Sequence, residues 1–243
     1  MTTSARTEPS PAPASDAAAP PPWHIRTFKP RRGRMTSAQS EALARLWPRW
    51  GFAIPAEGEL LDLRLLYGRS APLQVEIGCG MGDAVAAMAA ATPEHDFLAV
   101  DVHTPGLGNV LRMAERAGLT NVRAAAGDAL DLLRSQLPSD SLEVVHVYFP
   151  DPWPKARHHK RRIVRPDVIA LIADRLRCGG SLHCATDWAE YAEEMLEVLC
   201  AEPWLRNRHP GFAPRPTHRP VTKFEARALR EGREVFDLSF VKI

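Results

Sequence analysis

A glycine-rich turn follows the first strongly apolar run of the chain. The run at 73–77 leads into the residues GCGMG at 78–82, after which a helix is predicted. Glycine lets a ligand approach the backbone closely, and parallel sheets bind ligands at the carboxyl ends of their strands. The spacing is GxGxG, whereas dinucleotide-binding proteins use GxGxxG. The turn therefore predicts a ligand beside Gly78 and Gly80.

An aspartate lies at the end of each of the next two apolar runs. Asp101 lies in the run at 97–102, where a carboxylate can accept hydrogen bonds from both hydroxyls of a ribose. Asp128 follows the run at 122–126, where it can hold an adenine amino group. The alternative role for each aspartate is a helix N-cap. A ribose, an adenine and no phosphate-binding spacing together predict S-adenosylmethionine as the cofactor.

A rigid aspartate follows the fourth apolar run. The run at 142–149 leads into the residues FPDPWP, in which prolines flank Asp151 and Trp153 lies beside it. The prolines restrict the backbone and aim the Asp151 carboxylate at the mouth of the sheet. We expect Trp153 to offer a flat face there, which suits a base drawn out of its stack. A proline-rich turn after a buried strand is the alternative.

Apolar runs and helical segments alternate along the chain from residue 73. The runs lie at 73–77, 97–102, 122–126, 142–149 and 181–186, and helices are predicted at 83–91, 106–117, 129–137, 166–177 and 188–200. This alternation indicates βαβ units and a parallel sheet. The run at 235–241 predicts a closing strand, and Gly179-Gly180 predicts the end of a helix.

The first part of the chain differs in composition from the rest. Residues 1–22 contain Ala, Pro, Ser and Thr with almost no large apolar residue, which predicts a disordered tail. Residues 23–243 are predicted to form a single domain that begins with a basic arm at 23–50. A helix within this arm is predicted to end before Pro48.

Positive charge is concentrated in three stretches, although the net charge is only +2. Residues 23–50, 151–165 and 205–233 each carry a clear excess of Lys and Arg, which favours a polyanion-binding surface over three unrelated solvated faces. No apolar run is long enough to span a membrane, and no secretory signal is seen. The four cysteines are dispersed and are predicted to be small buried residues, so we expect a cytoplasmic protein without a metal site.

The run FPDPWPKARHHKRRIV resembles the signature of the bacterial tRNA (guanine-N7)-methyltransferases. The segments LQVEIGCGMG, FLAVDVHTPG, HCATDWAEY and PRPTHRPVTKFE are similar to the same family, and the resemblance covers residues 24–243. It implies a Rossmann-like class I S-adenosylmethionine-dependent methyltransferase fold: an α/β fold with a mostly parallel sheet and an antiparallel closing strand. It also implies methyl transfer to guanine N7 in tRNA, at position 46 of the variable loop.

The resemblance assigns roles to individual residues. Asp151 matches the residue with the catalytic role. The cofactor contacts of the family match Glu76, Asp101, Asp128 and Asp151. Its substrate-binding positions match Lys155, Asp187, Thr222, Lys223, Phe224 and Glu225. The family usually has Glu where this chain has Asp101, so we expect the ribose contact to be longer or shifted.

The expected chemistry depends on placement. Neutral guanine carries an available lone pair on N7, so catalysis requires N7, the methyl carbon and the sulfur to be held nearly in line. Asp151 is expected to accept hydrogen bonds from guanine N1–H and the amino group and to favour the growing positive charge of the ring. Asp187 and Glu225 are alternative carriers of this contact.

Basic and aromatic residues near the site have expected roles as well. The run after the site is expected to bind tRNA phosphates through Lys155, Arg157, Lys160, Arg161 and Arg162. Arg215, Arg219 and Lys223 lie in a Pro-rich loop that either closes over the substrate or remains a solvated loop. Trp188 and Tyr191 either line the guanine pocket or pack in the core.

Three other functions fit the sequence less well. A methyltransferase that acts on an amine usually has Asn or Asp followed by Pro-Pro and an aromatic after the fourth strand. A nicotinamide-dependent oxidoreductase requires the spacing GxGxxG. A non-catalytic RNA-binding module would bind tRNA without the cofactor. We expect tRNA as the partner, no membrane, and a monomer or homodimer.

Overall fold

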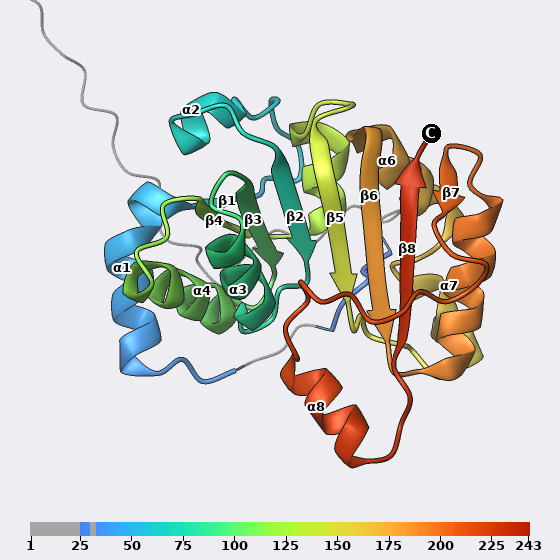
Figure 1. Ribbon diagram of the computed structural model, residues 1–243. Helices are drawn as coiled ribbons and strands as arrows, with labels where there is room; N and C mark the ends of the chain where they lie inside the picture. Colours follow the sequence, from blue (N-terminus) through green and yellow to red (C-terminus); the bar gives the residue numbers. More distant parts are fainter. Residues whose placement is uncertain (1–24, 30–32) are drawn as a thin grey trace, which may run out of the picture.

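The structure, a computed structural model, describes residues 25–29 and 33–243 of the protein. The tail predicted at 1–22 lies outside the described residues, as do residues 23, 24 and 30–32 of the predicted basic arm. The described chain folds into alternating strands and helices around one sheet (Figure 1), so the predicted α/β class is confirmed.

Eight strands of the described chain form this sheet in the order β1-β4-β3-β2-β5-β6-β8-β7. Their bounds are β1 (Gly51–Ala53), β2 (Leu73–Ile77), β3 (Asp96–Asp101), β4 (Val122–Ala126), β5 (Leu142–Tyr148), β6 (Leu176–Thr186), β7 (Leu205–Asn207) and β8 (Phe236–Lys242). Neighbours are parallel as far as β6, whereas β8 is antiparallel to both β6 and β7. The predicted parallel sheet with an antiparallel closing strand is therefore confirmed. The connection order reverses between β2 and β5, which is where sheets of this kind bind ligands.

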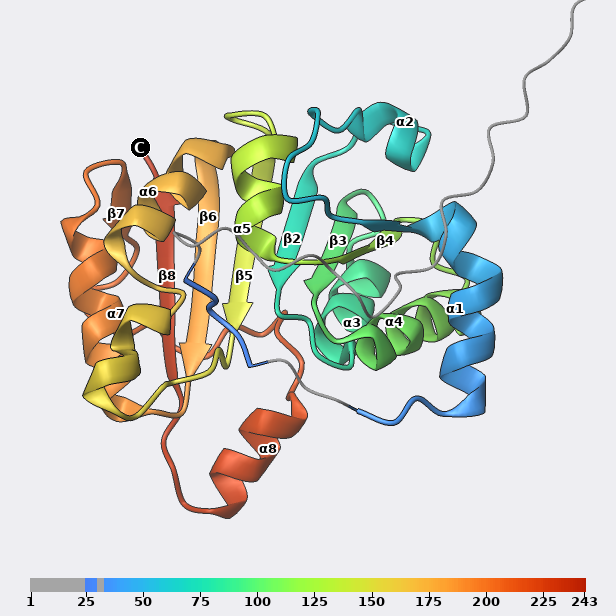
Figure 2. The same cartoon turned by 180° about the vertical axis from the view of Figure 1, so that it is seen from behind.

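Helices cover the two faces of the sheet unequally. The helices are α1 (Ser37–Trp50), α2 (Leu63–Tyr67), α3 (Asp83–Ala91), α4 (Thr104–Arg116), α5 (Ala129–Asp131), α6 (Pro166–Arg175), α7 (Ala189–Ala201) and α8 (Lys223–Arg230), with a π-helical turn at Leu132–Gln136 and a 3-10 helix at Ala156–Arg161. On the side seen in Figure 1, which we call the front, α3 and α4 lie over β3 and β4, with α1 packed against α4. From behind, α5, α6 and α7 lie over β5, β6 and β8 (Figure 2). In front of these last strands Figure 1 shows only the chain that runs from β7 to α8.

Apolar side chains on both faces hold the strands in place. Every residue of β2 is buried, as expected for a parallel strand covered on both sides. A front cluster joins α1, α3 and α4 to β3 and β4 and includes Trp47, Phe97 and Leu107. A larger cluster on the back packs α6 and α7 against β5 and β6. None of the helices in the described ranges is long and apolar enough to cross a membrane.

Two predicted helix ends are wrong. Helix α1 continues through Pro48 to Trp50, because Gly51 still donates its N–H to the Trp47 carbonyl and the Trp47 ring is buried against the front cluster. Helix α6 ends at Arg175, so Gly179-Gly180 does not stop a helix. These glycines lie in β6, where the pairing with β5 shifts register, and Gly179 has a φ of +80°.

The cysteine prediction is half right. Cys79 and Cys184 are buried, whereas Cys178 and Cys200 are exposed. The short elements β1, α2 and β7 were not predicted from the sequence, because segments this short carry too few positions to show a period, and α8 was not predicted either.

Candidate active site

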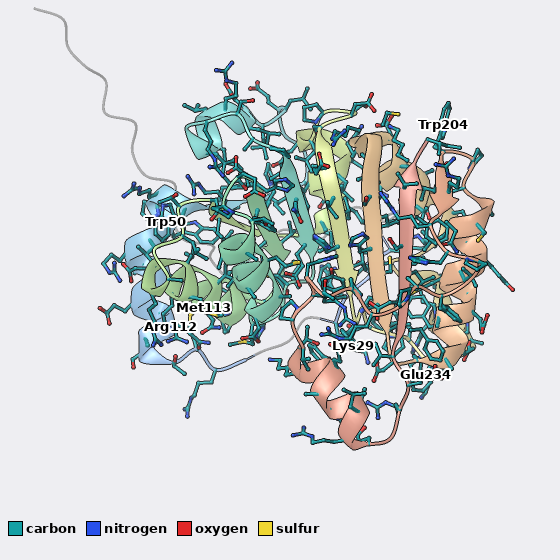
Figure 3. The ribbon with its side chains drawn as sticks, viewed as in Figure 1. Lys29, Trp50, Arg112, Met113, Trp204 and Glu234 are labelled. Atoms are coloured by element: carbon teal, nitrogen blue, oxygen red, sulfur yellow. The ribbon has the colours of Figure 1, made fainter. Side chains whose placement is uncertain are left out.

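A cleft opens at the carboxyl ends of β2, β3, β4 and β5. The sequence-predicted residues that line it are Gly78, Gly80, Asp101, Asp128, Asp151 and Phe224. It is closed on one side by Thr27, Phe28 and Lys29 of the arm. Figure 3 labels Lys29 just above α8, below the ends of the strands. The structure thus brings the residues of four strand ends together at the switch point of the sheet.

The glycine turn leaves open space at the floor of the cleft. Gly78 and Gly80 have positive φ angles of +74° and +56°, and a Cβ added at either would meet no heavy atom within 4 Å. Helix α4 approaches the turn so closely that a Cβ at Gly106 would lie 1.9 Å from the Gly80 carbonyl oxygen. Backbone geometry therefore requires glycine in the turn and in the helix beside it.

Asp101 fixes the glycine turn. Its carboxylate accepts hydrogen bonds from the N–H of Gly80 at 2.7 Å and from the N–H of His103 at 2.8 Å. Burial raises the pKa of Asp101, although these N–H groups oppose the shift. The carboxylate at the end of β3 thus contacts the turn itself while it lines the cleft.

Glu76 is a buried carboxylate on β2 with an unsatisfied oxygen. Its side chain is 4% exposed, and Oε2 has no hydrogen-bond partner among the described residues. Burial raises the pKa of Glu76 to about 8. The side chain lines a small recess that shares Gly78, Tyr148 and Phe224 with the cleft. A cationic group placed in this recess would satisfy the oxygen and lower the cost of its burial.

Asp128 acts as a helix cap and lines the cleft as well. Its side chain accepts a hydrogen bond from the N–H of Leu130 at 2.9 Å, which caps α5. The alternative that the sequence left open for Asp128 is therefore present in the structure. Its place beside Gly127 and Ala129 in the cleft wall keeps it next to the predicted adenine position.

Asp151 lies in a strained loop between two residues with positive φ. Phe149 has a φ of +50° and Trp153 has a φ of +47°, which non-glycine residues rarely adopt. The backbone N–H of Lys29 donates to Asp151 Oδ2 at 3.4 Å, and Arg162 Nε donates to the Pro152 carbonyl at 2.9 Å. Strain held by surrounding contacts is typical of functional sites.

Trp153 does not offer a free face to a base, which corrects our prediction. The side chain is 3% exposed, and its indole N–H donates to the Thr27 carbonyl at 3.2 Å. Lys29 Nζ and the Arg161 guanidinium each lie 5.0 Å from the ring centroid. The ring is occupied by these cations because the arm packs onto the loop after β5.

The predicted substrate-binding residues separate into two groups. Phe224 reaches the cleft, where its ring stacks on Phe149 with centroids 6.4 Å apart, and Thr222 and Lys223 line the recess beside Glu76. Lys155 and Asp187 line neither hollow. Lys155 is exposed, and Asp187 Oδ2 accepts hydrogen bonds from Arg233 at 2.7 and 3.0 Å.

The run from Thr222 to Glu225 is the start of α8 and not part of a loop. The Thr222 hydroxyl accepts a hydrogen bond from the N–H of Glu225 at 3.2 Å and caps the helix. The pattern Thr-x-x-Glu is a signature of a helix N-terminus, so the sequence did contain a signal for α8 that the loop interpretation missed.

Glu225 belongs to a buried ion-pair network. It is 2% exposed, and its oxygens lie 2.6 Å from Arg215 Nε and 2.6 Å from Arg219 Nη1. Arg219 also pairs with Asp237 of β8 at 2.8 Å. Burial works to raise the pKa of Glu225, but Arg215 and Arg219 hold it below its ordinary value. Both carboxylate oxygens face guanidinium groups, so Glu225 anchors α8 to the sheet.

Of the two aromatic residues at the start of α7, Trp188 is exposed and Tyr191 is buried in the core. Trp188 is 37% exposed, and Tyr191 is fully buried. The Tyr191 hydroxyl accepts a hydrogen bond from the Val164 N–H, and the Arg162 guanidinium lies over its ring. Arg162 is itself buried, so the prediction that it binds a tRNA phosphate is wrong.

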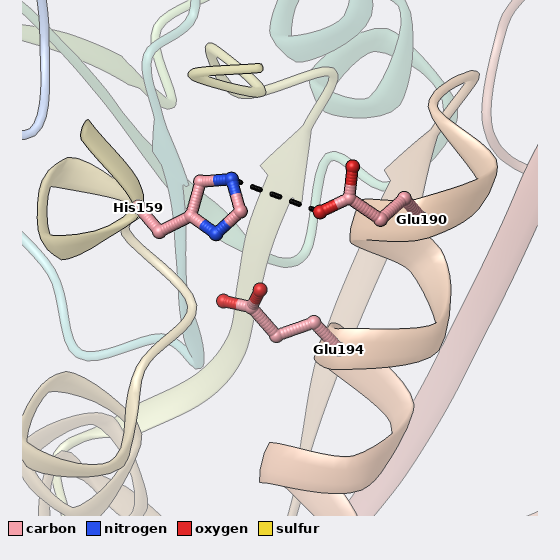
Figure 4. Close-up of side chains that lie close together, drawn as sticks. All are labelled: His159, Glu190 and Glu194. Atoms are coloured by element: carbon pink, nitrogen blue, oxygen red, sulfur yellow. Dashed lines mark ion pairs between the residues drawn. The ribbon is translucent and has the colours of Figure 1, made fainter. Parts of the chain in front are cut away.

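A group of possible metal ligands lies at the start of α7. Figure 4 shows His159 facing Glu190 and Glu194. The Arg162 guanidinium pairs with both glutamates and supplies the positive charge that a metal ion would bring. This group is therefore an ion-pair cluster that fastens the 3-10 helix to α7.

Sequence reasoning missed Tyr148, which lines both the cleft and the recess. Its hydroxyl lies 2.8 Å from His146 Nδ1, and His146 Nε2 lies 2.8 Å from the side-chain oxygen of Gln74. Because the Gln74 oxygen can only accept, Nε2 of His146 carries the proton and Tyr148 donates to Nδ1. Alternating polar residues within an otherwise apolar strand were the available signal.

Comparison with known proteins agrees with this arrangement. A family model described as "Putative methyltransferase" matches residues 70–238. The tRNA (guanine-N(7)-)-methyltransferase of Streptomyces avermitilis is 55% identical over 90% of this chain and 76% of its own length. The chain belongs to the tRNA (guanine-N(7)-)-methyltransferase family. The family member of Nitrosospira multiformis is 52% identical over 90% of this chain and 94% of its own length.

Solved structures of distant proteins show the same fold. The 16S rRNA methyltransferase KamB matches with a TM-score of 0.55 at 17% identity, over 76% of this chain and 96% of its own. The aminoglycoside resistance methyltransferase NpmB1 matches with a TM-score of 0.52 at 16% identity, over 76% of this chain and 95% of its own. The predicted class I methyltransferase fold is confirmed by this similarity.

Proposed function

We propose that this protein transfers the methyl group of S-adenosylmethionine to N7 of a guanine in the variable loop of tRNA. The observation that carries the proposal is the unsatisfied, buried Glu76 oxygen beside an open glycine turn, in a recess that adjoins the cleft lined by Asp101 and Asp151. Membership of the tRNA (guanine-N(7)-)-methyltransferase family supports the same activity.

The chemistry of the cleft fits S-adenosylmethionine, which supplies an electrophilic methyl group when it is bound. Glu76 would accept hydrogen bonds from the amino group of the methionine part, because its buried oxygen has no hydrogen-bond partner among the described residues. Asp101 would hold the ribose hydroxyls, and Asp128 would border the adenine. Gly78 and Gly80 leave the backbone open to the ligand.

Asp151 is the best candidate for the guanine contact. It lines the cleft, whereas Asp187 and Glu225 line neither the cleft nor the recess. A carboxylate here would accept hydrogen bonds from the N1–H and amino group of guanine, a donor face that adenine lacks. Its negative charge would also favour the ring as N7 takes the methyl group and becomes cationic.

The exposed basic residues beside Asp151 would hold the tRNA backbone. Lys155, Arg157, Lys160 and Arg161 are exposed on the segment that contains the 3-10 helix. Phosphate contacts position the RNA and release counterions, so tRNA binding should weaken steeply as salt rises. A flat response between low and moderate ionic strength would contradict this role.

The proposal is tested by methyl uptake into tRNA from a strain that lacks the modification. Purified protein and labelled S-adenosylmethionine should label the tRNA, and borohydride–aniline treatment should then cleave at one variable-loop guanine. If the tRNA is labelled but is not cleaved at a variable-loop guanine, the methyl group lies on another atom or at another position of the tRNA. If tRNA binds but no label is transferred at saturating donor, a non-catalytic RNA-binding role is favoured instead.

A further inference from the structure

A second hollow opens on the front of the sheet, outside the cleft and its recess. The chain between β7 and α8 crosses in front of β6 and β8 (Figure 1), and a cavity of about 390 Å³ lies between this segment and the strands. We call it the histidine pocket. Its polar lining includes Ser181, His183, Arg208, Arg215, His218 and the carboxylate of Asp237, which is paired with Arg219.

The imidazoles of this pocket include a nitrogen without a partner. The rings of His183 and His218 lie 5.2 Å apart, and His146 packs behind His183 at 5.5 Å. Nδ1 of His183 is buried and has no hydrogen-bond partner among the described residues. The His183 ring therefore borders the pocket with at least one nitrogen whose hydrogen bonding the described residues do not satisfy.

Arg208 supplies a positive charge at the edge of the pocket. One guanidinium nitrogen, Nη2, donates to the Ser181 hydroxyl at 2.9 Å, and the backbone N–H donates to the Ser239 carbonyl at 3.0 Å. No carboxylate pairs with Arg208 in the described part of the chain. A guanidinium has five N–H donors, so most of those of Arg208 remain for a ligand.

These groups together select an oxyanion. Guanidinium and imidazole N–H groups at one concave surface suit a ligand with several acceptor oxygens, such as a phosphate. A metal ion is disfavoured, because Arg208 and Arg215 are cationic and both nitrogens of His146 are engaged by Tyr148 and Gln74. Burial lowers the pKa of His183 to about 4, and it also lowers the pKa of His218. The neutral imidazoles therefore act as polar partners, and the charge comes mainly from Arg208, because Arg215 is paired with Glu225.

The pocket shares a wall with the cleft. The Arg219 guanidinium lies 5.6 Å from the ring centroid of Tyr148 and 5.7 Å from that of Phe149, and both rings line the cleft. Arg215 lines the pocket on the other side of this wall and binds the same Glu225 of α8. An RNA strand that places one base in the cleft can therefore place a nearby backbone phosphate in the pocket.

We propose that the histidine pocket binds a backbone phosphate of the tRNA whose guanine occupies the cleft, an inference that rests on the proposed function. Arg208 is the main cationic contact, and His183 and His218 complete the hydrogen bonding. The pocket thereby adds a contact on the front of the sheet to the basic segment beside Asp151.

The test compares Arg208→Gln and His218→Gln with the wild-type protein and with Arg134→Gln. Arg134 is an exposed arginine on the π-helical turn, on the back of the sheet, and serves as the matched control. The probe is an unmodified tRNA transcript, whose Kd is measured by filter binding at several salt concentrations. Thermal unfolding and cofactor titration of each variant check that the fold and the cleft are intact.

Arg208→Gln is expected to raise the Kd for tRNA roughly tenfold at low salt, because a hydrogen-bonded charge is lost. The slope of log K against log salt should become shallower by about 0.7 to 0.9, the value for one phosphate contact. His218→Gln should weaken binding less, and Arg134→Gln should match the wild type. The affinity for S-adenosylmethionine should be the same in all four proteins.

Two outcomes would overturn the inference. If the wild type methylates tRNA and Arg208→Gln binds it with unchanged affinity and salt slope, the pocket holds no RNA phosphate. If Arg208→Gln instead changes self-association in sedimentation, the pocket is a contact between copies of the chain. A wild type that binds tRNA but takes up no methyl group would refute the proposed function alone.

Discussion

The two halves of the front face of the sheet differ in chemistry. Over β3 and β4 the front face is apolar and is covered by α3 and α4, with Phe97, Ala99 and Ala124 fully or almost fully buried. Over β5, β6 and β8 no described helix covers it, and the strands present His146 and His183 beneath a loop. The apolar half therefore supports the glycine turn by close packing. In the polar half, ion pairs hold the covering segment, and a pocket remains open to a ligand.

The two halves also hold their neighbouring segments by different forces. In the first half, α4 packs by close backbone approach, as Gly106 against the Gly80 carbonyl shows. In the second half, α8 is held by the buried Arg219 between Glu225 and Asp237. Breaking an ion pair inside the protein should therefore matter far more than breaking one on its surface.

The largest effect on stability is expected for Arg219→Gln. This change leaves Glu225 and Asp237 as buried carboxylates without their main counter-charge, which should cost about 3 to 5 kcal/mol of unfolding free energy. Urea unfolding at pH 7 measures it. The matched control is Arg45→Gln, whose exposed pair with Glu115 should contribute little. Equal stabilities of the two variants would show that charge does not hold the polar half.

The largest effect on the reaction is expected for Asp151→Asn. Removing the charge beside the guanine should lower the rate of methyl transfer by about 100-fold to 1000-fold, because the charge acts mainly on the cationic ring that forms. Single-turnover transfer to tRNA at saturating donor measures this rate. Asp167→Asn, on the first turn of α6, is the control. An unchanged rate in Asp151→Asn would remove the electrostatic role.

A pH-dependent effect is expected from Glu76, which lies where the two halves meet. The pKa of this carboxyl rises from its usual 4.5 to about 8 in the folded protein, so the folded state binds a proton that the unfolded state has released. Its stabilising contribution is present below pH 4.5 and is lost as the pH rises through 8. Glu76→Gln should match the wild type at low pH and exceed its stability by about 2 to 4 kcal/mol above pH 8.

Urea unfolding of the cofactor-free protein across this pH range measures that difference. The same variant should bind S-adenosylmethionine more weakly, because an amide lacks the charge that attracts an amino group. If the unfolding free energies of the two proteins change with pH in parallel, the pKa of the Glu76 carboxyl is not raised. If Glu76→Gln binds S-adenosylmethionine with unchanged affinity, Glu76 does not contact the amino group of the cofactor.

The smallest effect is expected for Tyr148→Phe. The change deletes one hydroxyl and leaves His146 Nδ1 without its donor, which should cost about 1 to 2 kcal/mol of unfolding free energy. Since the ring still lines the cleft, the affinity for S-adenosylmethionine should change little. Loss of cofactor binding in this variant would mean that the hydroxyl itself contacts the ligand.

Short-range patterns explain what could be predicted from the sequence. The runs at 73–77 and 122–126 and the helix at 83–91 have the predicted bounds, because their periodicity and turn residues are local. Asp101 ends β3 and Asp151 follows β5, both strands that the apolar runs at 97–102 and 142–149 predicted, so their meeting in one cleft was predictable. In parallel strands the carboxyl ends share one edge of the sheet.

Long-range partners explain what could not be predicted. The resemblance assigns Glu225 to substrate binding, and nothing near it in sequence predicts that Arg219, which also pairs with Asp237, would pair with it inside the protein. Trp153 was expected to face a base, but it packs against Thr27 and Lys29 instead. These contacts join segments more than 120 positions apart, so the sequence around Trp153 does not predict them. These contacts depend on how the arm and α8 pack, which local patterns do not encode.

The central claim is that guanine N7 is the atom that receives the methyl group. It is tested most directly with a tRNA transcript in which every guanine is replaced by 7-deazaguanine, which keeps the Watson–Crick edge but has a C–H group in place of N7. The account predicts that the purified protein methylates the ordinary transcript and adds no methyl group to the substituted one. Undiminished incorporation into the 7-deazaguanine transcript would show that another atom is the acceptor.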